Sequence, residues 1–115
     1  MNSKDDLPFI EHILDSINAI DTFSKGLTRA RFTSDRLRHS AIIREIEIIG
    51  EAVKNISDPL KNRHKEVEWK DIVGTRDKMI HHYFGVDLDI VWAIIKFNLP
   101  KLKKSILKIK IELEA

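Results

Sequence analysis

Residues 88–113 are LDIVWAIIKFNLPKLKKSILKIKIEL, and this stretch decides the fold class. Apolar residues recur at every third or fourth position along its whole length, namely Val91, Ile95, Leu99, Leu102, Ile106, Ile109 and Leu113. That spacing is typical of one face of an α-helix. The register continues through Pro100, and two unrelated helices would not be expected to share it. We therefore predict one long helix that is kinked at Asn98-Leu99-Pro100.

A helix with the same spacing is expected near the N-terminus. Pro8 suits the first turn of a helix, and Asp6 is available as its cap. The apolar face would carry Ile10, Ile13, Leu14, Ile17 and Ile20, and the polar face Glu11, Asp15 and Asp21. We predict that the apolar face lies in the core.

The pattern also predicts a long helix from Ser34 to Ile56, with Thr33 or Ser34 as its cap and Asp58-Pro59 as its stop. One stripe holds Ile42, Ile46, Ile49, Val53 and Ile56, and Ala41, Ile43, Ile48 and Ala52 widen the apolar arc. So wide an arc predicts burial on two sides, one against the chain's own core and the other against a second subunit. Alternatively, Ile43 and Ile48 lie under the loop that follows.

Gly50 of this helix is predicted to mark a close approach between two helices. Glu47 and Glu51 fall on the polar face with Arg44 and Lys54. We interpret these four charges as ion pairs between residues three or four positions apart, in preference to a pair of catalytic carboxylates.

Two connecting segments carry little periodicity. Residues 24–34 contain Gly26 and are predicted to be a loop or a frayed helix end. Their bases Lys25, Arg29 and Arg31 would form either a solvated face or a patch that tracks phosphates. The charged segment LKNRHKEVE (60–68) is expected at the surface, because His64 has no second ligand at metal-binding spacing.

Composition limits the class of protein. The 115 residues, of which 43% are hydrophobic and 33% charged, predict one folded domain over 1–115. No apolar run is long enough to cross a bilayer, and acids near the start argue against a signal peptide. The absence of cysteine excludes disulfides and fits a cytoplasmic location. The net charge of +2 is too small to indicate general nucleic-acid binding, and no DNA partner is expected. The predicted fold is all-α, a helical bundle with four main helices.

The most informative stretch is WKDIVGTRDKMIHHYFGVD (69–87), which predicts a third long helix. Its apolar face would hold Trp69, Ile72, Val73, Met79 and Ile80. Arg76 lies in the middle of that face and breaks the pattern, as happens where function overrules packing. The alternative is that Arg76 extends to solvent or pairs with a carboxylate, either Asp87 or the Asp77 of a second copy.

Arg76 also begins a pattern of Arg, four residues, His, one residue, Tyr, formed with His81 and Tyr83. An arginine binds phosphate, a histidine moves a proton near neutral pH, and a tyrosine can accept a modifying group. In an unbroken helix His81 would lie about 140° around from Arg76, so we expect the helix to end or kink near His81. Gly85 and a cap at Asp87 are consistent with that end.

These residue types favour a site without a metal. The adjacent His81 and His82 point in different directions on a helix and cannot chelate one ion, and no HExxH, glycine-rich phosphate loop or GxSxG is present. Arg and His suffice for RNA cleavage by attack of the ribose 2′-hydroxyl, in which histidine transfers the proton and arginine stabilises the transition state. One histidine cannot easily be both base and acid, whereas two copies about a two-fold axis could supply both.

Three segments, IIGEAVKNIS (48–57), WKDIVGTRDKMIHHYFGVDLDIVW (69–92) and LPKL (99–102), are similar to the HepT-like branch of the HEPN domain proteins. The resemblance extends from about residue 8 to residue 107. It implies a dimeric bundle of four to five helices and a metal-independent endoribonuclease toxin with no cofactor. Arg76 and His81 would be catalytic and Tyr83 supporting. Asp77, His82 and Glu51 are candidates for accessory roles.

The resemblance also implies a partner, a small nucleotidyltransferase antitoxin that neutralises the toxin by attaching AMP to Tyr83. Two other hypotheses remain open at this point. In one, the chain is a non-catalytic HEPN module that binds a nucleotide or pairs with a nucleotidyltransferase, which fits its modest net charge. In the other, the chain is a purely structural bundle in which Arg76 is a paired core charge.

Overall fold

A computed structural model describes the backbone of residues 3–81 and 86–115 and the side chains of 5–79 and 86–115. Four long helical stretches dominate it: α1 (Leu7–Ser24), α3 (Arg36–Lys54), α5 (Trp69–His81), and a final stretch made of α6 (Leu88–Ala93), the π-helix η2 (Ile94–Asn98) and α7 (Leu99–Glu114). Shorter pieces are the 3₁₀-helix η1 (Ser3–Asp6), α2 (Arg29–Ser34) and α4 (Asp58–Arg63). The described part contains no strand, which confirms the all-α prediction.

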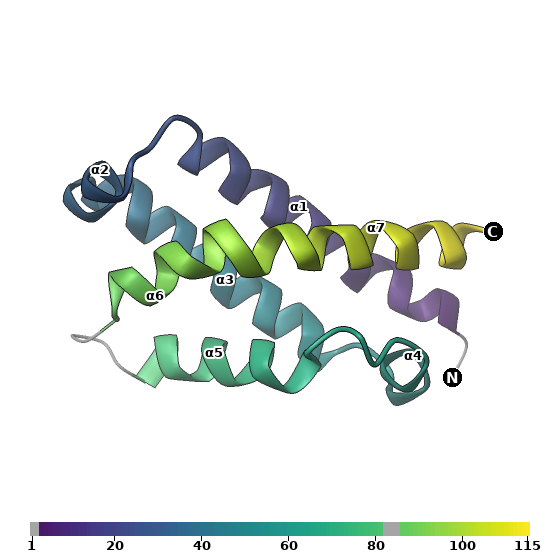
Figure 1. The fold of residues 1–115 in the computed structure, drawn as a ribbon. Coiled ribbons are helices and arrows are strands. Elements are labelled where there is room, and N and C mark those ends of the chain that lie inside the picture. Colours follow the sequence, from purple (N-terminus) through teal and green to yellow (C-terminus); the bar gives the residue numbers. More distant parts are fainter. Residues whose placement is uncertain (1–2, 82–85) are drawn as a thin grey trace.

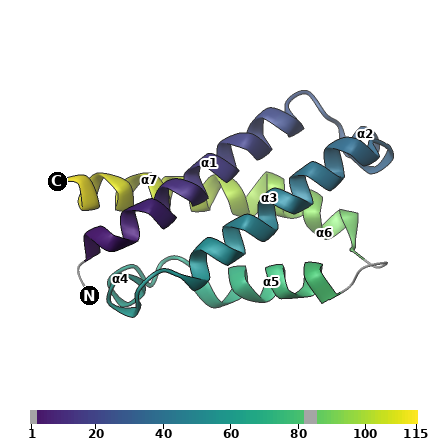
Figure 2. The same ribbon diagram turned by 180° about the vertical axis from the view of Figure 1, so that it is seen from behind.

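Helix α3 is the centre of the bundle (Figures 1 and 2). It packs against α1 on one side and α5 on the other, while α7 packs on α1 and crosses in front of α3 in Figure 1. The core holds the predicted stripes of α1 and α3, including Ile13, Ile17, Ile42 and Val53, each at most 1% exposed. The described helices include none that is long and apolar enough to span a membrane.

The long C-terminal helix is confirmed, and all seven residues of its predicted stripe are buried. Where a kink was predicted at Asn98-Leu99-Pro100, the structure has a π-helical segment, Ile94–Asn98, which ends two residues before Pro100. Proline has no N–H to donate and its ring clashes with the carbonyl four residues earlier. The wider π turn relieves that clash while the helix continues, so the apolar register is kept.

The start of α1 differs from the prediction. Asp6 occupies the cap position, but its side chain makes no capping hydrogen bond. Instead the buried carboxylate accepts hydrogen bonds from the backbone N–H of Ser57, at 2.8 Å, and from its hydroxyl, at 2.6 Å. A buried carboxylate needs such donors, and here they tie the N-terminus to the turn after α3.

The second predicted helix is shorter than expected. It begins at Arg36, and its cap is Asp35, whose carboxylate accepts the N–H of Arg38 at 3.0 Å, so neither Thr33 nor Ser34 is the cap. Asp58-Pro59, predicted to stop this helix, follows its end at Lys54 and forms the first turn of the next helix, α4.

The segment 24–34 was predicted to be a loop or frayed end, which is wrong for its second half. Thr28 caps α2 by accepting the N–H of Arg31 at 3.2 Å. Phe32 is fully buried, with its ring 5.4 Å from that of Trp92. Tertiary burial of this one aromatic residue holds a helix that is too short to show periodicity.

Candidate functional site

The candidate site is built where α5 crosses α3. Gly50 of α3 faces Arg76 of α5 so closely that a Cβ on Gly50 would overlap the Cβ of Arg76 and lie 2.5 Å from its Cγ. The predicted close approach at Gly50 is therefore confirmed. Only glycine lets the aliphatic part of the arginine lie directly on the α3 backbone.

Arg76 is fixed at its charged end by two carboxylates. Its Nη2 lies 2.6 Å from Glu51 Oε2, and its Nη1 lies 3.1 Å from Asp77 Oδ1. Lys54 Nζ also contacts Asp77 Oδ1, at 3.2 Å. We call Glu51, Lys54, Arg76 and Asp77 the α3–α5 charge network.

This network corrects two expectations. Glu51 and Lys54 pair across to α5 rather than along α3, and only the predicted pair Arg44–Glu47 forms within the helix, at 3.2 Å. Arg76 pairs with Glu51 and with the Asp77 of the same chain, so the alternative that it pairs with a carboxylate is confirmed, although that alternative named Asp87 or the Asp77 of a second copy. Neither error was avoidable from helix periodicity, which does not show which polar faces meet.

The electrostatics of the network are set by its two cations. Hydrogen bonds from Arg76 and then Lys54 hold the pKa of Asp77 below its ordinary value. The side chain of Arg76 is 21% exposed, and its buried Nε has no hydrogen-bond partner among the described residues. Arg76 is thus anchored by its two terminal nitrogens while part of its donor capacity is unused.

Helix α5 is described as far as His81, and the predicted helix end or kink near this residue concerns the residues that follow, which lie outside the described part. His81 lies on the same helix as Arg76, five positions later. The side chain of His81, and residues His82, Tyr83 and Gly85 altogether, lie outside the described part. Beyond them Asp87 caps α6 as predicted, because its carboxylate accepts the N–H of Asp89 at 2.9 Å.

A second polar cluster lies before α5, around His64, which was predicted to be at the surface. That prediction is wrong, because the residue is 7% exposed. Its Nε2 is 2.7 Å from Glu112 Oε2 and its Nδ1 is 3.1 Å from Glu66 Oε1, and Arg63 also contacts Glu112 at 3.1 Å. We call these four residues the His64 cluster. It joins the α4–α5 connection to the end of α7.

Carboxylates only accept hydrogen bonds, so both contacts of His64 are satisfied together when both ring nitrogens carry a proton. Burial alone would raise the pKa of the Glu112 carboxyl, but hydrogen bonds from His64 and Arg63 outweigh burial and hold that pKa below its ordinary value. The pKa of Glu66 is lowered by a backbone hydrogen bond and by His64. Neither this cluster nor any other group of described His, Asp and Glu side chains could hold a metal ion.

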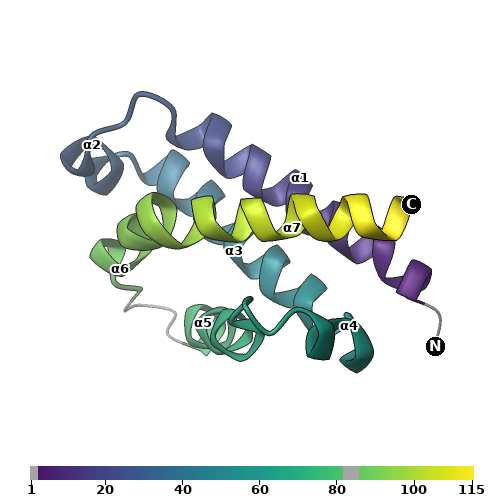
Figure 3. The same cartoon turned by 45° about the vertical axis from the view of Figure 1, so that its right-hand side comes forward.

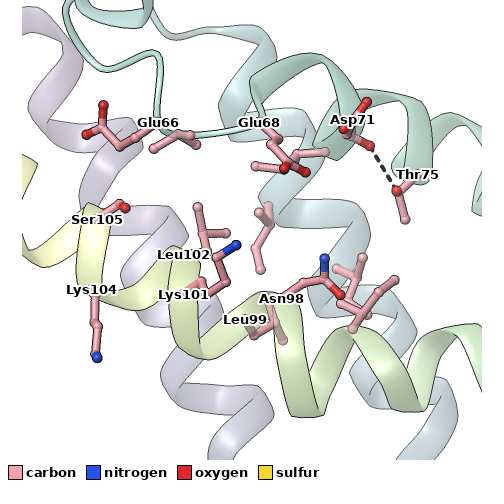
Figure 4. A pocket seen from close by; sticks show the side chains of 15 residues that line it. Glu66, Glu68, Asp71, Thr75, Asn98, Leu99, Lys101, Leu102, Lys104 and Ser105 are labelled. Atoms are coloured by element: carbon pink, nitrogen blue, oxygen red, sulfur yellow. Dashed lines mark hydrogen bonds between the residues drawn. The ribbon is translucent and has the colours of Figure 1, made fainter.

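An apolar groove of about 410 Å³ separates α5 from α7. Figure 4 shows Glu66, Glu68 and Asp71 along one side and Lys101 on the other, and the Thr75 hydroxyl donating to the Asp71 carbonyl at 2.9 Å. The floor is apolar and includes Ile46 and Ile49 of α3, Ile72 of α5, and Leu99 and Leu102 of α7. Arg76 does not line this groove, so the groove and the α3–α5 charge network are separate features.

Comparisons with known proteins match residues 13–109 to the family described as Ribonuclease HepT-like. A protein of Methanocaldococcus jannaschii named "Gamma-glutamylcyclotransferase and putative RNase" is 41% identical over 96% of this chain, which spans only 50% of that protein's length. A "Putative RNase" of Caldanaerobacter subterraneus is 41% identical over 89% of this chain and 91% of its own length. A "Probable ribonuclease HepT" of Thermococcus cleftensis is 38% identical over 89% of this chain and 93% of its own. No solved structure matches.

Proposed function

This chain belongs to the Ribonuclease HepT-like family, and we propose that it is an endoribonuclease toxin that cuts RNA with Arg76 and His81 and without a metal ion. The observation that carries the proposal is the anchoring of Arg76. A cation is held against Gly50 by Glu51, and it precedes His81 by five positions in the sequence. The names of two relatives, "Putative RNase" and "Probable ribonuclease HepT", support the same activity.

The proposed reaction needs only the groups present in the motif. His81 takes the proton from a ribose 2′-hydroxyl, and the oxygen attacks the adjacent phosphorus. The bond from phosphorus to the 5′-oxygen breaks, and that oxygen takes up a proton from a second histidine. The products are a 2′,3′-cyclic phosphate and a 5′-hydroxyl. Arg76 stabilises the extra negative charge on the phosphoryl oxygens as the new bond forms.

The charge network defines what Glu51 and Asp77 contribute. Two positive and two negative side chains leave it neutral. A guanidinium has five N–H donors, and the two carboxylates occupy only part of that capacity. Glu51 and Asp77 therefore act as positioning residues, which hold the guanidinium in one orientation while its remaining donors are free to meet a phosphate.

A second copy of the chain would supply the second histidine. Support for self-association comes from apolar side chains at the surface, because Ile90 is 58% and Phe97 72% exposed on the α6–η2 stretch. Ile48 on the wide arc of α3 is half-buried. Exposed apolar residues gathered on one helix are typical of interfaces. The mass of the protein in solution, measured by light scattering, is expected to be that of two chains, and a single-chain mass would contradict the shared site.

A nucleotidyltransferase antitoxin is the proposed partner, with Tyr83 as the residue that it modifies. Tyr83 is two positions after His81. Attaching AMP to its hydroxyl would add a phosphate charge and a nucleoside next to the catalytic histidine, which would repel and block an RNA phosphate. Mass analysis of the chain after co-expression with a nucleotidyltransferase should show one added AMP on Tyr83. An unmodified chain, or AMP elsewhere, would contradict this part of the proposal.

The activity itself is tested by incubating the purified protein with single-stranded RNA in excess chelator. The wild type should yield 2′,3′-cyclic phosphate ends. His81→Ala should cut at least about 100-fold more slowly, since general acid–base catalysis contributes about 10²- to 10⁴-fold. His12→Ala, at an exposed position of α1, is the matched control and should cut like the wild type. Lack of cleavage by the wild type, or equal cleavage by His81→Ala, rejects the proposal.

A further inference from the structure

The junction of α2 and α3 forms a polar concavity of about 440 Å³ that the proposed chemistry does not use. It is lined by Leu27, Arg31, Ser34, Asp35, Arg36 and Arg38. Arg31 comes from the last turn of α2, and Arg36 and Arg38 come from the first turn of α3. Asp35 both ends α2 and caps α3, and this tight junction brings the three arginines around one hollow.

The concavity concentrates positive charge. Three arginines and one aspartate give it a formal charge of +2, which equals the net charge of the entire chain. Asp35 is partly neutralised, because it lies 3.6 Å from Arg38 and accepts the Arg38 N–H. A protein that is nearly neutral overall therefore presents a local site at which an anion is favoured.

Arg31 and Arg36 differ from the other exposed arginines in their ion pairing. Arg29 pairs with Asp89 at 2.6 Å, and Arg44 pairs with Glu47 at 3.2 Å. Within the part of the chain that the structure describes, the guanidinium groups of Arg31 and Arg36 have no ion-pair partner. Both residues are exposed. Two neighbouring guanidinium groups that lack carboxylates can bind phosphate, since each offers a planar fork of N–H donors.

The concavity is connected to the rest of the bundle through α2 and lies at the same end as the proposed catalytic residues. Buried Phe32 anchors α2 against Trp92, and Arg29 pairs α2 with Asp89 of α6. Figures 1 and 3 show the α2–α3 junction at the same end of the bundle as the C-terminal end of α5, which carries His81, with α6 beside them. A chain of phosphates bound at the junction could thus continue toward His81.

We infer that this concavity is a phosphate subsite for the backbone of single-stranded RNA, with Arg31 and Arg36 as its phosphate-binding residues. The identity of the ligand as RNA rests on the proposed function. Contacts to phosphates fix the position of a nucleic acid and carry no base preference. The subsite therefore holds the strand while the Arg76 and His81 site cuts it, and it raises affinity for RNA of any sequence.

The test uses an RNA that carries 2′-O-methyl groups, which cannot be cut by 2′-hydroxyl attack. Its affinity is measured by fluorescence anisotropy at several salt concentrations for the wild type and for R31A/R36A. The matched control is K61A/K65A, which removes the same charge near α4, at the opposite end of the bundle in Figure 1. Circular dichroism confirms that each variant is folded.

R31A/R36A should bind about tenfold more weakly, and its plot of log affinity against log salt should be shallower by about 1.4, since each phosphate contact on a single strand contributes about 0.7. K61A/K65A should stay within about twofold of the wild type. D35N keeps a good helix cap and removes a negative charge from the concavity, so it should bind about twofold to threefold more tightly.

Equal weakening by the two double variants, or no measurable binding by the wild type, would overturn the subsite. The proposed function fails separately. If the wild type binds the methylated RNA through Arg31 and Arg36 but does not cut ordinary RNA, the subsite is supported and the ribonuclease activity is rejected. If the wild type cuts RNA and R31A/R36A binds the methylated RNA as tightly as the wild type does, the activity is supported and the subsite is rejected.

Discussion

The α3–α5 charge network and the His64 cluster both place charged side chains inside a helical bundle, but they complete their hydrogen bonds to different degrees. His64 is 7% exposed, both of its ring nitrogens meet carboxylates, and its carbonyl accepts the indole N–H of Trp69 at 3.0 Å. The Arg76 side chain is 21% exposed, its Nε has no partner among the described residues, and the neighbouring Glu51 side chain is 57% exposed. The first arrangement closes a structural cross-link, whereas the second anchors a cation by its two terminal nitrogens.

The largest expected effect comes from filling the close approach that places Arg76. Gly50→Ala puts a methyl group into the Cβ and Cγ of Arg76, which forces α5 away from α3. We expect the free energy of unfolding to fall by about 2 kcal/mol, as for other overpacked sites, and RNA cleavage to be lost as Arg76 moves.

Gly74→Ala is the matched control for that substitution, because Gly74 is also helical and has nothing within 4 Å of an added Cβ. It should gain about 0.5–1 kcal/mol from the better helix propensity of alanine. Urea unfolding measures both changes. Equal effects of the two substitutions would show that the contact between Gly50 and Arg76 has no special role.

Breaking the His64 cluster should reduce stability and leave catalysis intact. His64→Ala removes both carboxylate contacts and leaves Glu112 without its histidine partner. We expect a loss of about 2 kcal/mol in unfolding free energy, because the substitution removes a buried ring and two hydrogen bonds that contribute about 1 kcal/mol each. Cleavage below the unfolding transition should be unchanged. A variant that folds stably but cuts slowly would assign this cluster to the active site.

Glu51→Gln should show the reverse pattern with a smaller magnitude. The Glu51 side chain is 57% exposed, so losing its ion pair should cost less than about 1 kcal/mol of stability. The orientation of Arg76 should loosen, and we expect kcat to fall about tenfold with KM little changed, with partial recovery in Glu51→Asp. A pure rise in KM would indicate that Glu51 affects substrate binding rather than the position of Arg76.

The smallest effect is a pH dependence of stability that involves Glu112. Its folded-state pKa lies below the ordinary 4.5, so its contribution is present above the unfolded-state pKa and is lost as pH falls through the folded-state pKa. Wild type should exceed Glu112→Gln in stability near neutral pH by less than about 1 kcal/mol, and the difference should vanish once the pH has fallen below the folded-state pKa of Glu112. A difference that persists unchanged at low pH would show that charge at Glu112 is not the cause.

The helices could be predicted from the sequence because their cause is local. The helical spacing of the apolar residues from Val91 to Leu113 is visible in the sequence of that segment alone. Gly50 indicates a close approach between helices because it has no side chain. The motif of Arg76, His81 and Tyr83 is likewise visible in one short stretch. These features need no knowledge of which helices meet.

The polar partnerships could not be predicted, because their members are far apart in the chain. Asp6 binds Ser57, 51 positions later, and His64 binds Glu112, 48 positions later. Helix periodicity shows which side of a helix is apolar but not which polar faces meet. Glu51 was assigned to pairs along α3 for this reason. The one available signal was its position directly after the glycine at the crossing.

Comparing Arg76 with Arg63, the arginine of the His64 cluster, tests the central claim most directly. The measurement is the single-turnover rate of RNA cleavage in chelator for the wild type, Arg76→Ala and Arg63→Ala. We predict that Arg76→Ala falls by at least about 100-fold, as when a group that stabilises transition-state charge is removed, while Arg63→Ala stays within about threefold of the wild type. Equal rates for the two variants, or no cleavage by the wild type, would contradict the assignment of Arg76 to catalysis.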